Sequence, residues 1–444
     1  MAQFKKAHTS IMMAQSNPTF SQLIRVFTRI GFLSFGGPAG QIALMQHEIV
    51  DERQWVEQGA FLRALNLCHL LPGPEAQQLA TWIGWRLHGI KGGLAAGLLF
   101  VIPGAAVMLG LSLLYVMAAG LGWFAALFLG IKAAVLGIVV QALIRVGKRA
   151  LGTQFKFAMA FAAFLALFWF HAPFPLVILL AAVAGAVAGK YRPEWLGKAH
   201  HPPVGEHQPS AGKLAGQTLL TVLIWAAIWA LPMVVVAATL GRESVLWDIG
   251  AFFSKLAVVT FGGAYAVLAY MAQQSVTHFH WLSAGEMADG LGLAESTPGP
   301  LIMVTQFTGF LAAYRQPGIL SPWLSGLLGA GLTTWVTFAP CFLWIFACAP
   351  WMERLERSKV MQAALAAITA AVVGVIANLA LWFALHVLFV RAESGVFGLP
   401  EWASLDWRAA LIASVAALML FRFKRGVPMV LAVAAGLGLI LAWV

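Results

Sequence analysis

Two segments of this chain place a glycine between two prolines, within stretches otherwise apolar enough for a membrane helix: Pro72-Gly73-Pro74 and Pro298-Gly299-Pro300. Proline lacks a backbone N–H and clashes with the preceding turn, so each of these PGP segments should break a helix. The helix that follows a break offers free N–H groups and a partial positive charge, which suit an anion. A kink used for packing would explain one such segment, whereas two symmetric copies favour a binding site.

A second pair of motifs is Phe35-Gly36-Gly37 and Phe261-Gly262-Gly263. In the first copy, Pro38 can start a half-helix at its first turn, and Gln41 lies one turn further on, where it can donate a hydrogen bond. The second copy, TFGGAYAVLAY, lacks both the proline and the glutamine. Because glycines also let membrane helices pack closely, a binding role and a packing role both fit these residues.

Two carboxylates flank the PGP segments. Glu75 directly follows the first segment, and Glu295 precedes the second by three residues. Ionisable residues at membrane depth are costly and indicate a function, so either carboxylate could carry a proton. For Glu75, a charge that complements the dipole of a helix N-terminus is the alternative. Polar side chains near the first break that could face a cavity are Asn66, Gln77 and Gln78.

Several basic residues lie within or beside the apolar stretches and could attract an anion: Arg25, Arg29, Arg63, Arg86, Lys132 and Lys255. Each is better explained as an interfacial residue whose long side chain reaches the membrane surface. The segments 46–65 and 275–291 mix charged and apolar residues, and the second contains the capping-box pattern Ser283-x-x-Glu286. We interpret both segments as structural.

The paired motifs share one register. The FGG motifs, the PGP segments and the pair Trp55 and Trp281 are each separated by 226 residues. A gapless register over three landmarks indicates an internal repeat. The predicted division is a cytoplasmic N-terminal segment (1–19), a first repeat (20–190), a polar loop with a connector helix (191–249) and a second repeat (250–444).

The charge of equivalent loops alternates between the two repeats. RVGKRALGTQFK in the first repeat is strongly basic and its counterpart VRAESGVFGLPEWASLDW is net acidic, whereas HAPFP is uncharged and its counterpart RFKRG is basic. Under the positive-inside rule, equivalent loops then lie on opposite sides of the membrane. The sequence therefore predicts two inverted-topology repeats, with the N-terminus in the cytoplasm.

The composition is that of a polytopic membrane protein. Of 444 residues, 61% are hydrophobic and 10% are charged, against about 25% charged residues in soluble domains. The apolar runs predict an all-α fold with about 13 transmembrane helices, each roughly 20 residues long where it spans the bilayer fully. The net charge of +11 follows from the basic loops, so no nucleic-acid partner is expected.

Enzyme chemistry has no signature in the sequence. Histidines and cysteines lack metal-ligand spacing, and there is no phosphate-binding loop followed by Lys-Ser/Thr, so neither a metal, a cofactor nor an ATPase is predicted. A membrane-embedded enzyme would need a constellation such as HExxH, which is absent. Inverted repeats with broken helices are typical of secondary transporters, which bind substrates at the breaks. The sequence does not separate such a carrier from an anion channel.

The stretches FLSFGGPAGQIALMQHEIV, LPGPEAQQLATWIG, VTFGGAYAVLAYM and ESTPGPL resemble the chromate ion transporter family, in its long form with two fused halves. The resemblance covers nearly the whole chain. It implies export of chromate from the bacterial cytoplasm across the inner membrane, driven by the proton gradient, with sulfate or another oxyanion as the alternative substrate. Membrane lipid is the expected surrounding, and a homodimer is left open.

The resemblance also implies which residues bind the substrate. We add Gln77 to them, since it could face a cavity at the first break. The residues that match the family motifs are Gly36, Gly37, Pro38, Gln41, Pro72, Gly73, Pro74, Gly262, Gly263, Pro298, Gly299 and Pro300. The second half reads FGGA where a third glycine is common, which leaves the role of its FGG motif less defined.

Overall fold

The computed structural model describes residues 18–35, 37–118, 120–196, 211–261, 264–352, 358–389 and 400–442. Within these ranges the regular structure is helical, and the β pairing is an isolated bridge between Phe389 and Leu405. Six of the described helices are long and apolar enough to cross a membrane. The predicted all-α, polytopic fold is confirmed.

The first half contains α2 (Phe20–Leu33), α3 (Gly37–Met45), α4 (Gln58–Leu70), α5 (Glu75–Ala118), α6 (Gly122–Ala150), α7 (Gln154–Phe168) and α8 (Phe174–Tyr191). After α9 (Ala211–Thr239), the second half contains α10 (Val245–Val259), α11 (Ala264–Gln273), α12 (Ala284–Ser296), α13 (Val304–Arg315), α14 (Pro322–Cys348), α16 (Lys359–Leu388), α17 (Trp407–Ala417) and α18 (Val427–Leu441). Short π-helical segments, η1 (Gln46–Glu52) and η3 (Gln274–His278), follow α3 and α11.

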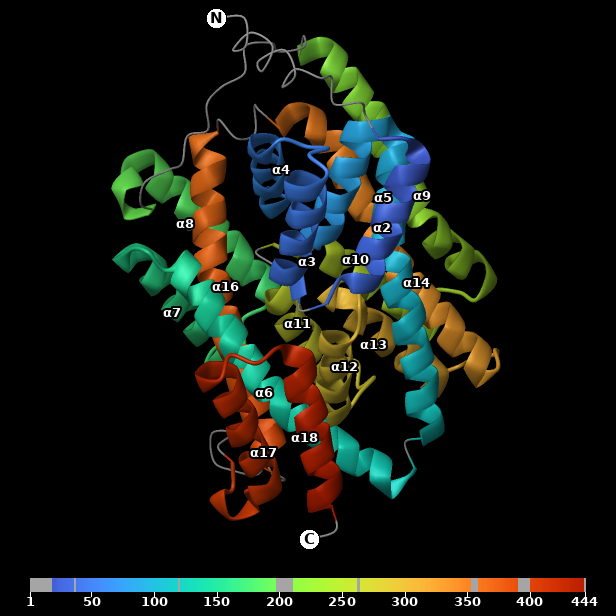
Figure 1. Cartoon of the computed structure of the whole chain (residues 1–444), viewed down its shortest axis with the longest axis vertical. Helices are drawn as coiled ribbons and strands as arrows, with labels where there is room; N and C mark the ends of the chain where they lie inside the picture. The colour runs from blue at the N-terminus through green and yellow to red at the C-terminus, as the bar shows by residue number, and fades with distance from the viewer. Residues whose placement is uncertain are drawn as a thin grey trace, which may run out of the picture.

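The two halves repeat the same order of elements in the predicted register. Helices α4 and α12 have the same bounds after a shift of 226 residues, and α2 and α10 agree to within a residue. In Figure 1, α4 lies toward one end of the molecule and α12 toward the other, with α3, α10 and α11 between them, as inverted repeats require.

Several helix boundaries follow from local sequence. The predicted capping box starts α12, because the Ser283 hydroxyl accepts from the Glu286 N–H and the Glu286 carboxylate accepts from the Ser283 N–H. Thr19 and Gln22 form the same arrangement at the start of α2. Helix α3 begins at Gly37, so the predicted half-helix with Pro38 in its first turn is confirmed.

The breaks produce helices of half length, and α5 contains a turn where the sequence predicts one helix to end near residue 87 and the next to begin near residue 94. His88 and Gly89 leave the helical conformation, with φ of +61° at Gly89. The chain reverses there, because Gly84 in the first arm packs against Gly92 and Ala96 in the second. Helices α13 and α14 form the equivalent hairpin through Gly309 and Gly329. The number of about 13 spans stays a prediction, since α2, α3, α4, α10, α11, α12 and α13 are too short to span a bilayer alone.

The halves interlock through their long helices. Helix α6 of the first half packs against α17 and α18, and α16 of the second half packs against α7 and α8 (Figure 1). Glycines make the closest of these contacts, because Gly130 of α6 faces the backbone of Ala434 and Gly374 of α16 faces the backbone of Ala160. Small residues at such crossings let membrane helices approach closely.

We predict that Gly374→Ala destabilises the protein and that Gly110→Ala does not. A Cβ at residue 374 would lie 2.8 Å from the Phe164 nitrogen and closer still to the Ala160 oxygen, whereas one at residue 110 would meet no atom within 4 Å. Overpacking of this kind costs about 1–3 kcal/mol. Thermal unfolding in detergent measures both variants. An unchanged midpoint for Gly374→Ala would contradict the tight crossing of α16 and α7.

Candidate functional site

Each PGP segment, called a tip below, is hydrogen-bonded to the end of a helix in the other half, and the two bonds are reciprocal. The Gly73 N–H donates to the Thr260 carbonyl oxygen at 2.8 Å, and the Gly299 N–H donates to the Ser34 carbonyl oxygen at 2.9 Å. Ser34 and Thr260 are the C-caps of α2 and α10. Both the donors and the acceptors are related by the repeat distance of 226 residues, so the contact follows the internal symmetry.

The residue types of the tips fit these bonds. Gly73 and Gly299 have φ of +121° and +90°, a region that L side chains rarely adopt. The prolines on either side of each glycine have no N–H, so the glycine supplies the one donor of each PGP segment. The Ser34 hydroxyl donates back to the Ile30 carbonyl oxygen at 2.6 Å, which ties down the end of α2.

Each PGP segment also packs against the proline-containing long helix of the other half. A Cβ on Gly104, which follows Pro103 in α5, would lie 2.5 Å from the Pro298 oxygen and 3.1 Å from the Gly299 Cα. In the equivalent position, a Cβ on Gly73 would lie 3.0 Å from the sulfur of Cys341, which follows Pro340 in α14. Each predicted break is therefore held against a helix of the other half.

Gln41 is buried and donates a hydrogen bond, as predicted. Its Nε2 atom lies 2.6 Å from the Gly299 carbonyl oxygen and 3.4 Å from the Ser34 carbonyl oxygen. The second half has Val267 at the equivalent position, so this bond has no symmetric copy. Gly36, Gly262 and Gly263 lie outside the described residues.

Glutamines line the first break on its other side. Gln77 and Gln78 are fully buried, and their Nε2 atoms donate to the Thr81 hydroxyl at 3.1 Å and to the Pro72 carbonyl oxygen at 2.7 Å. Within the described part of the chain, their Oε1 atoms and the hydroxyl of Thr337 have no hydrogen-bond partner. Because buried polar atoms in proteins are nearly always paired, the two Oε1 atoms mark polar surface beside the first break that the described residues leave unused.

The two predicted proton-carrying residues stand at different distances from solvent. Glu75 begins α5, and its Oε1 atom lies 3.0 Å from His69 Nδ1. The His69 side chain is about half exposed, so this pair is close to solvent. Glu295, near the end of α12, is buried. The two are not equivalent in the repeat, because Leu301 occupies the position that corresponds to Glu75 and His69 the position that corresponds to Glu295.

A buried ionic cluster was missed by the sequence analysis. Asp289 of α12 accepts a hydrogen bond from the Tyr115 hydroxyl at 2.7 Å and lies 3.4 Å from Lys132 Nζ. The rule that an ionisable residue at membrane depth indicates function would have selected Asp289. It was not selected because the segment 275–291 was interpreted as interfacial, and Lys132 as reaching the membrane surface.

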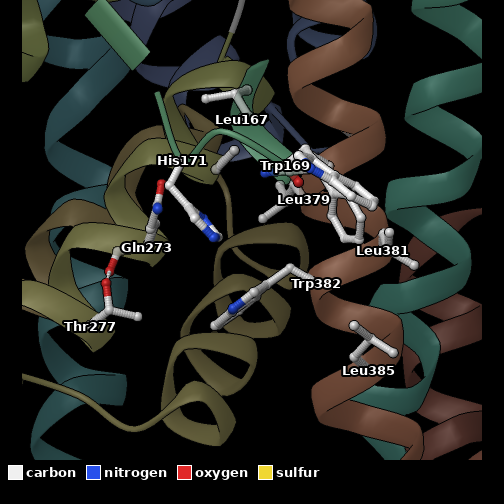
Figure 2. Close-up of a pocket in the computed structure, with 12 residues that line it drawn as sticks. Leu167, Trp169, His171, Gln273, Thr277, Leu379, Leu381, Trp382 and Leu385 are labelled. Carbon is white, nitrogen blue, oxygen red and sulfur yellow. Dashed lines mark hydrogen bonds between the residues drawn. The ribbon is translucent and has the colours of Figure 1, made fainter. Parts of the chain in front are cut away.

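A cavity of about 710 Å³ lies between α7, α11, η3 and α16. Figure 2 shows Gln273 and Thr277 from one side of it and Trp382 and Leu385 from the other, with His171 at its edge. Its walls are mostly apolar, and its polar side chains include Asn378 of α16 as well as Gln273 of α11 and Thr277 of η3, the two elements that follow the FGG motif of the second half. The cavity thus runs beside the half-helix that starts at a predicted break.

Comparison with known proteins identifies the family. A model of the chromate transporter family matches residues 21–186 and 247–439. The chain belongs to this family. The two matched ranges correspond to the two halves of the structure and leave out α9 (Ala211–Thr239).

Three named relatives cover most of this chain. The chromate transport protein of Cupriavidus metallidurans is 30% identical over 95% of this chain and 93% of its own length. That of Pseudomonas aeruginosa is 32% identical over 81% of this chain and 79% of its own length. An uncharacterized transporter of Methanocaldococcus jannaschii is 24% identical over 85% of this chain and 87% of its own length. No solved structure matches the chain.

We predict that Gly299→Ala destabilises the protein more than Gly318→Ala does. Both glycines have positive φ, so both substitutions strain the backbone, at a cost of about 1–2 kcal/mol. Only at residue 299 would the new Cβ also meet a neighbour, the Gly104 Cα at 3.1 Å, since a Cβ at residue 318 would meet no atom within 4 Å. Thermal unfolding of both variants measures the difference, and equal losses would argue against close contact at the tips.

Proposed function

We propose that this protein is a secondary active transporter that exports chromate from the bacterial cytoplasm across the inner membrane, in exchange for protons. The observation that carries the proposal is the reciprocal pair of hydrogen bonds by which each PGP segment is bonded to a helix end of the other half. The names of its relatives supply the substrate, since two of them are chromate transport proteins.

The proposed anion site lies beside the paired breaks. The first-turn amides of α5, at Ala76 and Gln77, have no acceptor within their own helix and lie at its positive end. The side-chain amides of Gln41, Gln77 and Gln78 are buried nearby, and in this conformation their N–H groups are bonded to protein oxygens, from which they would have to be released to reach an anion. A tetrahedral dianion such as chromate needs several converging N–H groups, and the helix start and the neighbouring amides are the groups proposed to supply them.

The glycine N–H groups of the PGP segments become donors only when the tips separate. In this conformation both are bonded to the carbonyl oxygens of Ser34 and Thr260. In the proposed cycle, the tip of one half moves away from the helix end of the other half. The glycine N–H groups then donate to the anion instead of to the carbonyl oxygens. The remaining predicted site residues, Gly36, Gly37, Pro38, Gly262 and Gly263, would shape the backbone on the FGG side of the same region.

Proton coupling at the site is assigned to the two carboxylates beside the tips. Glu75 and Glu295 each lie within one helical turn of a PGP segment. Exchange requires that protons and the anion use the transporter alternately, so these carboxylates carry protons inward in the anion-free state and release them to the cytoplasm before chromate binds. The gradient across the inner membrane then drives chromate outward.

We predict that Pro72→Ala and Pro298→Ala each reduce chromate transport by about tenfold or more, the equivalent of about 1.4 kcal/mol. Alanine adds an N–H and lifts the restriction on φ at the start of the PGP segment, which loosens the break although the second proline remains. The assay is uptake of labelled chromate into everted membrane vesicles, with and without an acidic interior. Pro317→Ala, in the loop between α13 and α14, is the control and should leave uptake unchanged.

The same assay with labelled sulfate decides the substrate. Chromate and sulfate are tetrahedral dianions of similar size, so uptake of sulfate without chromate would retain the mechanism and change the substrate. Movement of anion without any response to the proton gradient would indicate a channel. No movement of either anion would overturn the proposal.

A further inference from the structure

Asp289 lies in a closed ionic cluster between three helices. It is buried on α12, and its Oδ2 atom receives the Tyr115 hydroxyl of α5 at 2.7 Å and faces Lys132 Nζ of α6 at 3.4 Å. Its other oxygen, Oδ1, has no hydrogen-bond partner among the described residues. A carboxylate held by one hydroxyl and one ammonium group, with an unpartnered oxygen, is costly to keep charged away from water.

The cluster breaks the symmetry of the repeat. The residue equivalent to Asp289 in α4 is Arg63, and the second half has Met352 where the Pro103–Pro340 register places the counterpart of Tyr115. The backbone bonds at the tips are present in both halves, whereas this buried carboxylate is present in one. A feature that the shared fold does not need is a candidate for a function performed once per molecule.

The titratable groups around Asp289 come from four elements. Lys132 lies on α6, Tyr115 on α5, Glu286 one turn away on α12, and Arg315 at the end of α13. Arg315 is paired with Glu286 and with the Trp281 carbonyl oxygen. The described residues of η4 (Leu301–Met303) and α18 carry no titratable side chain. The titratable residues of α16 are Lys359 and His386, and His386 Nδ1 contacts the Trp382 carbonyl oxygen of its own helix.

A route to solvent begins next to this cluster. A cavity of about 700 Å³ is lined by Arg315, Ser283 and Gln316. Arg315 pairs with Glu286, which lies three residues before Asp289 on the same helix. The Lys132 side chain is 27% exposed, against 3% for Asp289, so Lys132 has room to leave the carboxylate. The partly exposed Lys132 is therefore the member of the cluster that links Asp289 to solvent.

The cluster is mechanically connected to the second PGP tip. Asp289 lies on α12, whose C-cap Thr297 directly precedes the second PGP segment. Tyr115 lies on the helix whose Gly104 packs against Gly299. The bonds of Asp289 to Tyr115 and Lys132 thus hold α12 against the same helix, α5, that its tip contacts. Loss of the carboxylate charge would weaken the attraction to Lys132 and loosen both contacts.

We propose that Asp289 is a proton-binding residue of the transport cycle, which takes a proton from the solvent side when Lys132 leaves and returns it when Lys132 pairs again. This inference rests on the proposed proton-coupled transport and adds a proton site remote from the anion. Protonation leaves a neutral acid hydrogen-bonded to Tyr115 and a lysine free to move, and it releases α12 from α6. Proton uptake and movement of the second tip are then one event.

The first test uses the full chain in proteoliposomes, with Asp289→Asn and the matched control Glu286→Gln on the same helix. Two measurements are compared: exchange of labelled chromate at equal concentrations on both sides, and chromate accumulation driven by a pH gradient. Asp289→Asn should keep exchange and lose the gradient-driven accumulation, while Glu286→Gln keeps both. Gradient-driven accumulation at the wild-type level in Asp289→Asn would overturn the inference.

A second test does not depend on chromate being the substrate. The infrared difference spectrum of the purified protein between acidic and alkaline buffer should contain a carboxylic-acid C=O band that Asp289→Asn removes. Tyr115→Phe keeps the carboxyl and should shift this band, because a hydrogen-bond donor is lost. A wild-type spectrum without an Asp289-dependent band overturns the inference. Absence of chromate exchange in the wild type, with the band present, would instead count against the proposed function alone.

Discussion

A helix that breaks inside an apolar interior must still pair every backbone N–H and C=O group, because no bulk water is there to replace the lost helical bonds. This protein meets that constraint with two hydrogen bonds, from Gly73 to Thr260 and from Gly299 to Ser34. Each break in one half is completed by a helix end of the other half. Neither half satisfies its own backbone alone, so the breaks and the association of the halves are one structural solution.

The rest of the architecture keeps the tips in this contact. Helices α6 and α16 each pack against the short terminal helices of the opposite half, so the halves are interlocked at their periphery as well as at the centre. Glycines at 130 and 374 set how closely these helices approach. Because the same two bodies meet at the periphery and at the tips, a small relative movement of the halves would change both tip bonds together.

The backbone is symmetric but the side chains around it are not. Gln41 has Val267 as its counterpart, Glu75 has Leu301, and Asp289 has Arg63. A symmetric frame can present two alternative arrangements of nearly equal energy, as alternating access requires. Asymmetric polar groups then restrict anion and proton chemistry to particular places within that frame.

The sequence by itself determined the helical membrane fold, the positions of the breaks and the register of the repeat, because apolar runs, proline and glycine act locally and the motifs recur at one spacing. It also predicted the start of α3 and the cap of α12. The acceptors of the Gly73, Gly299 and Gln41 donors and the cluster of Tyr115, Lys132 and Asp289 were decided only by the tertiary structure. These are contacts between residues far apart in the chain, so no local pattern encodes them.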